Sequence, residues 1–401
     1  MKPALMKPAL TRAGATLATA LLLTVALGGC STVKGWFGGK SGADKPLKPA
    51  ELTQIAPSVT VTKLWSASVG KGEGRIGARQ GPGIADGHVY AAAIEGGVRA
   101  FDLQTGAALW HFDSDLPLSG GPGAGAGLVV VGSLEGDVIA LDASTGTQKW
   151  AAKVSNEVIA APVIGQGMVY VRSNDGRVTA FDAASGERRW FWNHDLPTLT
   201  VRGNDAPVLG PGYLFVGNDD GTVVALSIAD GRPLWEQTVA TAEGRSDLDR
   251  MADVDGTPVL DGTTLYATSY KNQTMAIDGP SGRPLWTRDN GGPGRAGVSS
   301  ERVVVTDPAG TIWGLDKASG GVMWQQPALA RRNLTGPAIQ GDYAVIGDFD
   351  GYLHWLKLTD GAFAARMRTG GDAVRAAPVV ADGILVVQTT GGQLSAYRLG
   401  Q

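Results

Sequence analysis

The chain has 401 residues, a formal net charge of −3, a single cysteine and 59 glycines. The near-neutral charge, without a cluster of Lys or Arg, argues against nucleic-acid binding, and one cysteine excludes an internal disulfide or a thiolate metal cluster. Abundant glycine with only 18% charged residues favours short strands joined by tight turns.

Residues 1–29 are typical of a secretory signal peptide. Positive charges at Lys2, Lys7 and Arg12 precede an apolar run over 13–27, which is too short to be a comfortable membrane span. The run ends in Leu-Gly-Gly-Cys at Cys30, which resembles the lipobox of bacterial lipoproteins. In that family the chain is cut before the cysteine and the cysteine is acylated, so Cys30 is the expected lipidation site. The alternative is an ordinary secretory signal in which the cysteine has no role.

The same resemblance implies an anchor in the outer membrane. In that family Asp after the cysteine tends to retain the lipoprotein in the inner membrane, and here Ser31 follows Cys30. Acyl chains would hold the protein firmly, because each buried methylene contributes ~0.8 kcal/mol. Residues 30–57 are rich in Gly, Ser, Lys and Pro, so we expect a lipidated flexible tether there. The opening MKPAL recurs from Met6, which leaves either Met1 or Met6 as the initiator.

Residues 58–401 repeat the pattern A-x-D-x-x-T/S-G-x-x-x-W, with mostly 40–50 residues between tryptophans. Full or nearly full copies end at Trp110, Trp150, Trp190, Trp235, Trp286 and Trp324, and a worn copy covers 355–365. Two short apolar strands around a Gly turn precede each copy, starting at Pro82, Pro122, Pro162, Pro207, Pro258, Pro337, Pro378 and, without a Pro, near Gly297. Each unit predicts four antiparallel strands, so the whole predicts an all-β, eight-bladed β-propeller.

The two ends of the repeat region predict a closed ring. Residues 59–66 form a Trp strand, around Trp65, with no unit before it, whereas residues 394–399 form a third strand with no Trp strand after it. The N-terminal strand is therefore expected to complete the last blade, which removes exposed sheet edges. The alternative is an open solenoid of the same units. The recurring Asp is expected to bond turn amides, the Gly to adopt positive φ, and the Trp to pack between blades.

The repeat resembles that of the pyrroloquinoline quinone (PQQ) dehydrogenases, which also have eight blades. Those enzymes carry a vicinal disulfide, a Ca²⁺ ion and a catalytic Asp. Here the sole cysteine is assigned to the lipid, and the four histidines, at 88, 111, 194 and 354, are scattered without metal-ligand spacing. No catalytic, metal-binding or cofactor-binding residue is therefore predicted, and a quinoprotein-like enzyme is the alternative to a binding protein.

Two segments, in adjacent blades, break the repeat. The first adds an apolar, Arg-tipped stretch over 196–205 after Trp190. The second, after Trp235, is about ten residues longer than its counterparts and has an expected acidic face, with arginines between the acids: Asp247, Asp249, Asp253, Asp255, Arg245 and Arg250. Function in a repeat protein tends to sit where the repeat is violated, so these segments are the candidate site.

Over residues 30–401 the chain resembles the BamB family, the lipoprotein propellers of the β-barrel assembly machinery. The most specific matches are LPTLTVRGNDAP (196–207) and SDLDRMADVDGTP (246–258). The family uses these loops to hold the barrel insertase BamA through its POTRA domains. The resemblance implies contact residues at Leu199, Val201, Arg202, Asp253, Asp255 and, beside the acidic pair, Arg250.

The expected function is a non-enzymatic scaffold on the periplasmic face of the outer membrane, which binds BamA and aids insertion of β-barrel proteins. Sheet edges or a groove of the propeller are a further expected site for unfolded outer-membrane proteins. Two alternatives stay open for the loops: they pack on each other over a blade gap, or the aspartates cap turns or pair with Arg202 within the propeller. An envelope adaptor with a different partner is the third class of function.

Overall fold

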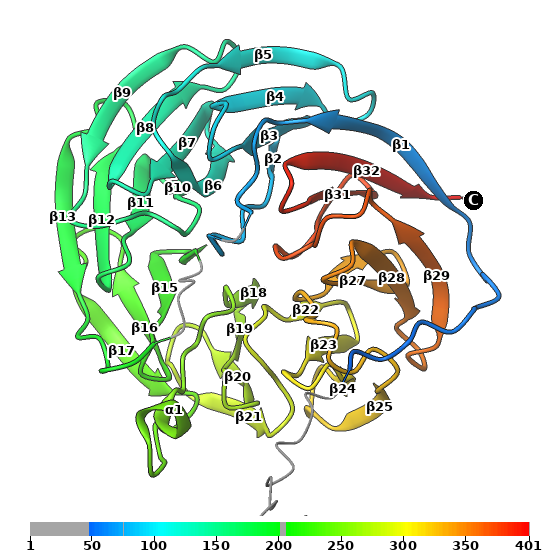
Figure 1. The fold of residues 1–401 in the computed structure, drawn as a ribbon. Coiled ribbons are helices and arrows are strands. Elements are labelled where there is room, and N and C mark those ends of the chain that lie inside the picture. The colour runs from blue at the N-terminus through cyan, green and yellow to red at the C-terminus, as the bar shows by residue number, and fades with distance from the viewer. Residues whose placement is uncertain (1–47, 75, 201–205, 401) are drawn as a thin grey trace, which may run out of the picture. The chain divides into compact units, whose positions relative to one another are not determined.

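The computed structural model describes residues 48–74, 76–200 and 206–400. In the unit Pro49–Gln401 the strands form eight antiparallel sheets of four strands each, arranged in a ring (Figure 1). The all-β, eight-bladed propeller predicted from the repeat is therefore confirmed. Among the described residues, no helix has both the length and the apolar character needed to cross a membrane. The expected lipidation site, Cys30, lies outside the described residues.

The first four blades follow the repeat in chain order. Blade 1 contains β2 (Gly83–Ala85), β3 (His88–Ala92), β4 (Val98–Asp102) and β5 (Ala108–Phe112). Blade 2 contains β6 (Leu118–Gly125), β7 (Leu128–Ser133), β8 (Asp137–Asp142) and β9 (Gln148–Lys153). Blade 3 contains β10 (Val163–Gly165), β11 (Met168–Arg172), β12 (Arg177–Asp182) and β13 (Arg188–Asn193). Blade 4 contains β14 (Val208–Gly210), β15 (Tyr213–Gly217), β16 (Thr222–Ser227) and β17 (Pro233–Thr238).

The last four blades complete the ring. Blade 5 contains β18 (Val259–Asp261), β19 (Thr264–Thr268), β20 (Thr274–Asp278) and β21 (Pro284–Arg288). Blade 6 contains β22 (Gly297–Val298), β23 (Arg302–Thr306), β24 (Ile312–Asp316) and β25 (Val322–Gln326). Blade 7 contains β26 (Ala338–Gln340), β27 (Tyr343–Gly347), β28 (Tyr352–Lys357) and β29 (Phe363–Arg368). Blade 8 contains β30 (Val379–Ala381), β31 (Ile384–Gln388), β32 (Gln393–Leu399) and β1 (Val61–Ser68).

The ring closes through the two ends of the repeat region. The first strand of each blade contacts the first strands of both neighbouring blades, including β2 of blade 1 against β30 of blade 8. Blade 8 has the order β1-β32-β31-β30, so the N-terminal strand supplies the outermost strand that the C-terminal unit lacks. Its register runs from Val61 opposite Leu399 to Ser68 opposite Gln393. The predicted closure is confirmed, and the open solenoid is excluded.

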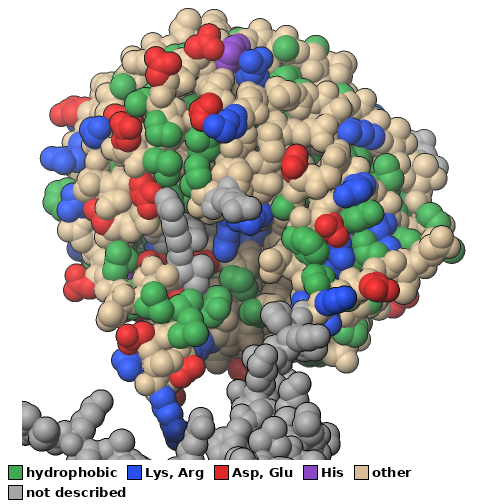
Figure 2. Space-filling view, viewed as in Figure 1, with side chains coloured by type: hydrophobic (Ala, Val, Ile, Leu, Met, Phe, Trp, Pro, Cys, Tyr) green, Lys and Arg blue, Asp and Glu red, His purple; other side chains and the backbone are tan. Residues whose placement is uncertain are grey.

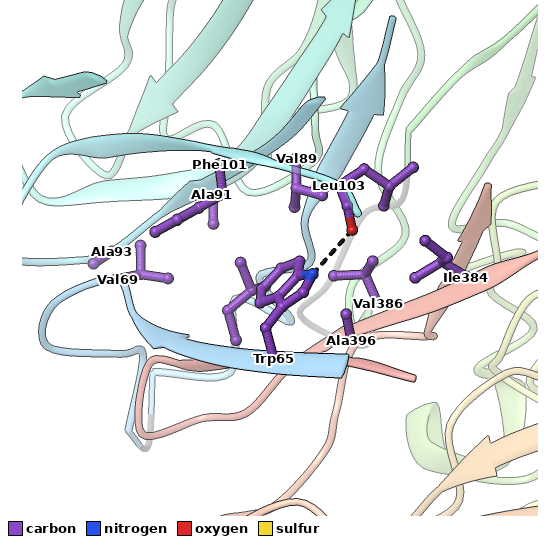
Figure 3. Close-up of a cluster of buried hydrophobic side chains, with 11 residues drawn as sticks. Trp65, Val69, Val89, Ala91, Ala93, Phe101, Leu103, Ile384, Val386 and Ala396 are labelled. Atoms are coloured by element: carbon purple, nitrogen blue, oxygen red, sulfur yellow. Dashed lines mark hydrogen bonds between the residues drawn. The ribbon is translucent and has the colours of Figure 1, made fainter. Parts of the chain in front are cut away.

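Interblade packing is centred on the recurring tryptophan. The Trp65 Nε1–H donates to the Leu103 carbonyl of blade 1 at 2.9 Å, and the ring packs among Val89, Phe101 and Val386 (Figure 3). Six further tryptophans donate in the same way to the next blade: Trp110, Trp150, Trp190, Trp235, Trp286 and Trp324. The worn copy has Ala365 at this place, and its buried Trp355 instead donates to Gln340 within blade 7.

The tight turn before each outer strand has the structure that its sequence predicts. Asp102 Oδ1 accepts from the Gln104 N–H at 3.1 Å and from the Thr105 N–H at 2.8 Å. These hydrogen bonds, with the Thr105 hydroxyl first among them, lower the pKa of Asp102. Gly106 then has φ of +70°, and its Cα faces the Trp65 ring so closely that an added Cβ would lie 2.5 Å from it. The turn is thus locked to the tryptophan of the preceding blade.

Residues 49–58 form a strap across blade 7, and most of them belong to the expected tether. The Ala50 N–H donates to the Ala330 carbonyl at 2.9 Å, and the Ser58 N–H donates to the Ala364 carbonyl at 2.8 Å. Leu52 packs against the buried cluster between blades 6 and 7. The last part of the segment expected as a tether, 30–57, thus has backbone partners and an apolar surface on blade 7 and on the connection that precedes it.

A buried polar network holds the strap from below. Arg332 donates to the Ala50 carbonyl at 3.1 Å and Arg366 to the Thr53 carbonyl at 2.7 Å. Both arginines meet one buried pair, since Arg332 Nε donates to Asp348 Oδ2 at 2.7 Å and Arg366 Nε donates to His354 Nδ1 at 3.0 Å. His354 Nε2 lies 3.0 Å from Asp348 Oδ2. Because Nδ1 accepts a hydrogen bond, the imidazole is neutral and carries its proton on Nε2.

Candidate functional site

Both segments that break the repeat connect the outermost strand of one blade to the innermost strand of the next. The first joins β13 to β14 and the second joins β17 to β18, so they occupy successive blade junctions. Backbone bonds tie each of them to a turn between the second and third strands of a blade, from the His194 N–H to Gly176 and from the Val254 N–H to Asn218. The two segments therefore lie on the same face of the ring.

The first segment is anchored at its start and exposes leucines beyond it. His194 Nε2 lies 2.8 Å from Asp220 Oδ2, and the imidazole stacks on Trp192 with 5.4 Å between ring centroids. The hydrogen bond to Asp220 raises the pKa of His194. Leu196 and Leu199 follow with 42% and 43% of their surface exposed. The predicted contact residues Val201 and Arg202 lie outside the described residues.

The second segment projects the one-turn helix α1 (Asp247–Arg250), seen at the rim of the ring in Figure 1. Ser246 caps it by accepting from the Asp249 N–H, while the Asp249 side chain accepts from the Ser246 N–H. Arg250 donates to the Gly244 carbonyl at 3.3 Å and pairs with Asp247 at 3.5 Å, so it is half exposed and already engaged. Leu248 stands on this turn with 64% of its surface exposed.

The four aspartates of the second segment do not form one acidic face, which corrects the sequence-based expectation. Asp247 and Asp249 are exposed on α1, whereas Asp253 and Asp255 are 0% and 1% exposed. The reason is the path of the chain after α1, because residues 251–256 run inward beneath the face and are all buried. Both buried carboxylates engage other groups of the chain. The acidic pair therefore acts inside the protein and not at its surface.

A buried ion pair lies beside these carboxylates and was not anticipated from the sequence. Arg172 Nη2 lies 3.2 Å from Asp219 Oδ1, and Arg172 also donates to the Gly217 carbonyl at 2.5 Å. Carboxylate oxygens of Asp219, Asp253 and Asp255 lie within 4.8 Å of one another. Burial raises the pKa of Asp219, and the charge of Arg172 opposes that shift. The signal in the sequence was an Arg ending the apolar strand β11.

Comparison with known proteins gives consistent matches over nearly the whole chain. The family model described as outer membrane protein assembly factor BamB matches residues 94–326 and 309–399. A protein of that name from Xanthomonas campestris pv. campestris is 63% identical over 388 residues, covering 94% of this chain and 96% of its own. The crystal structure of BamB from Moraxella catarrhalis superimposes with a TM-score of 0.77 at 25% identity, covering 84% of this chain and all of that one.

A second group of similar structures consists of enzymes. Quinohemoprotein alcohol dehydrogenase from Comamonas testosteroni has a TM-score of 0.66 at 16% identity, and the match covers 84% of this chain and 76% of that one. Identity this low extends the likeness to the eight-bladed fold alone.

Proposed function

Because the chain belongs to the outer membrane protein assembly factor BamB family, we propose that it is a scaffold lipoprotein that binds the barrel insertase BamA. The family consists of assembly factors and not of enzymes, so the likeness to quinone-dependent dehydrogenases concerns the fold only. The observation that carries the proposal is the pair of lengthened segments on one face, which present Leu196, Leu199 and Leu248 to solvent.

In this proposal, Leu199, Val201, Arg202 and Arg250 contact the POTRA domains of BamA. Exposed apolar side chains beside an arginine suit a contact centre, because burial of the leucine drives association and the guanidinium fixes orientation. Asp253 and Asp255 contribute indirectly, since buried carboxylates position the segments that carry the contact residues. Exposure of Leu248 on a capped turn makes it a further contact residue, and a preordered turn loses little entropy on binding.

We assign residues 1–29 to the signal peptide and Cys30 to the lipid anchor that holds the protein at the periplasmic face of the outer membrane. The contacts of residues 49–58 with blade 7 support ending the tether at Lys48. Metabolic labelling with palmitate tests the anchor: the Cys30→Ala variant should lose the label and leave the membrane fraction. Label retained on the variant would place the lipid elsewhere.

The interaction is tested by pull-down from detergent-solubilised envelopes. The Leu199→Ala/Arg202→Ala variant should lose BamA while keeping the wild-type melting temperature. Leu285→Ala is the matched control, because Leu285 is also a leucine, is 45% exposed and lies on the outer strand β21. Equal capture by all three proteins would show that the contact lies elsewhere on the propeller. Capture of BamA by none of them would favour an adaptor with a different partner.

A further inference from the structure

The centre of the ring holds a cavity that the proposed scaffold role does not use. It has a volume of about 240 Å³ and is lined by residues from all eight blades, which lie within β6 in blade 2 and just before or at the start of the innermost strand in the other blades. Ligand pockets for cofactor-sized molecules usually measure about 300–1,000 Å³. The cavity therefore suits a small group or the end of a chain, and not a large cofactor. Figure 2 shows Lys or Arg side chains beside the hollow near the centre of this face.

The repeat identifies which lining residues are unusual. The residue before the first Pro of each blade is small in seven blades: Gly81, Gly121, Ala161, Ala206, Thr257, Gly336 and Ala377. Close backbone packing explains the glycines, because a Cβ on Gly121 would lie 2.8 Å from the Gly81 carbonyl oxygen and one on Gly336 would lie 2.7 Å from that of Arg295. Blade 6 departs from this rule and has Arg295 at the same place.

Two more arginines line the cavity, from blades 1 and 8. Arg79 and Arg375 both stand three residues before the Pro of their blade. Arg79 has φ of +52°, a conformation that L residues seldom adopt without a compensating role. Three arginines therefore line one small space, and none of the described residues that line it is an Asp or Glu.

One described carboxylate, that of Glu73, interacts with two of these arginines. Glu73 is 4% exposed, and its Oε2 accepts from the Gln80 N–H at 3.3 Å. Burial raises the pKa of Glu73, and the Gln80 N–H and the charges of Arg375 and Arg79 oppose that rise. Arg295 also engages another group of the chain, so the inference depends on Arg79 and Arg375 as donors. A concave site with positive walls concentrates anions.

We infer that the mouth of the central channel binds an oxyanion, either the carboxylate of an acidic peptide or a small free anion such as phosphate. Guanidinium groups suit this ligand because their planar forks donate paired hydrogen bonds to carboxylate and phosphate oxygens. Arg79 and Arg375 lie outside the segments proposed to bind BamA, although Ala206 and Thr257 at the ends of those segments line the cavity, so failure of this inference would leave that proposal intact.

Titration calorimetry on the intact protein tests the inference, with a hexaglutamate peptide, a hexaglutamine peptide and inorganic phosphate as probes. The glutamate peptide should bind, more tightly at low salt, and the glutamine peptide should not. The Arg79→Asn/Arg375→Gln variant should bind at least about tenfold more weakly, because it loses charge-assisted hydrogen bonds. Asn tolerates the left-handed conformation at position 79. Arg232→Gln removes one positive charge from an exposed turn, as many as Arg375→Gln alone removes, and should bind as wild type does.

The outcomes of the titrations distinguish an oxyanion site from its absence. Phosphate binding that requires the two arginines, without peptide binding, supports the oxyanion site and identifies a small free anion as its ligand. Peptide binding that is equal in the double variant and the wild type overturns the inference, as does the absence of binding by both anionic probes. Far-UV circular dichroism of the double variant establishes that it is folded, and the single Arg375→Gln variant, which changes an exposed side chain, repeats the comparison.

Discussion

The closeness of Gly106 to Trp65 leads to a quantitative prediction for Gly106→Ala. Both Gly106 and Gly87, in the same blade, have positive φ, at +70° and +74°. Alanine in this conformation costs roughly 1–2 kcal/mol, of which about 0.4–1 kcal/mol is offset by a stiffer unfolded chain. A Cβ on Gly87 meets nothing within 4 Å, so Gly87→Ala should lower the free energy of unfolding by only about 1 kcal/mol.

At Gly106 a steric clash adds to the loss of unfolding free energy. The new Cβ would lie 2.5 Å from Trp65 Cγ and Cδ2, and the indole cannot withdraw without losing its hydrogen bond to Leu103. Forced overpacking typically costs about 1–3 kcal/mol, so Gly106→Ala should lose about 2–4 kcal/mol in total. Urea unfolding at constant m-value measures both variants.

The same reasoning is refuted by either of two results. Equal losses for Gly87→Ala and Gly106→Ala would show that Trp65 does not confine the turn. In a Trp65→Ala background only the Cβ of residue 65, at 2.8 Å, still lies close to the new Cβ, so Gly106→Ala should cost less than it does in the wild type. An undiminished loss in that background would place the cause in the turn itself.

Three further predictions concern the buried network and α1. Stability, measured by the urea midpoint, should fall as the pH drops below about 6.5, because burial lowers the pKa of His354 in the folded protein and the unfolded chain therefore takes up the proton first. The His354→Gln variant should show a weaker dependence of the midpoint on pH, and an unchanged dependence would exclude the histidine as its source. Arg332→Ala should cost about 3–5 kcal/mol, because it leaves buried Asp348 without its main cation, whereas exposed Arg232→Ala should stay within about 0.5 kcal/mol of wild type in the same assay. Ser246→Ala should speed amide hydrogen exchange over 247–250 without moving the global midpoint, since α1 buries no side chain; a shifted midpoint would contradict this.

The architecture was predictable because the repeat carries its own geometry. The Asp, Gly and Trp of each unit define a turn and an interblade contact, so Trp65 and the incomplete last unit sufficed to predict ring closure. The positions of the site segments followed from their departure from the repeat. The burial of Asp253 and Asp255 did not, because only the inward path of residues 251–256 separates them from Asp247 and Asp249.

The strap and the central cavity escaped prediction for a similar reason. Composition alone favoured a disordered segment over 30–57, and the carbonyl and guanidinium groups that hold its last residues come from blade 7 and the connection that precedes it. Arg79, Arg295 and Arg375 are far apart in the sequence, and none of them stands out when its own blade is considered alone. They come together because ring closure brings the segments before the innermost strands of blades 1, 6 and 8 to one centre.

The strap also determines how the ring would carry mechanical load. Tension applied to the chain before Pro49 reaches the Ala50 and Thr53 carbonyls first, where Arg332 and Arg366 transmit it into the interior of blade 7. Strand β1, which closes the ring by pairing with β32, follows these contacts in the chain. Force applied from the N-terminal side therefore acts first on blade 7, whose four strands follow one another in the chain. The pair β1 and β32, which is held by hydrogen bonds between the two ends of the chain, is protected from that force.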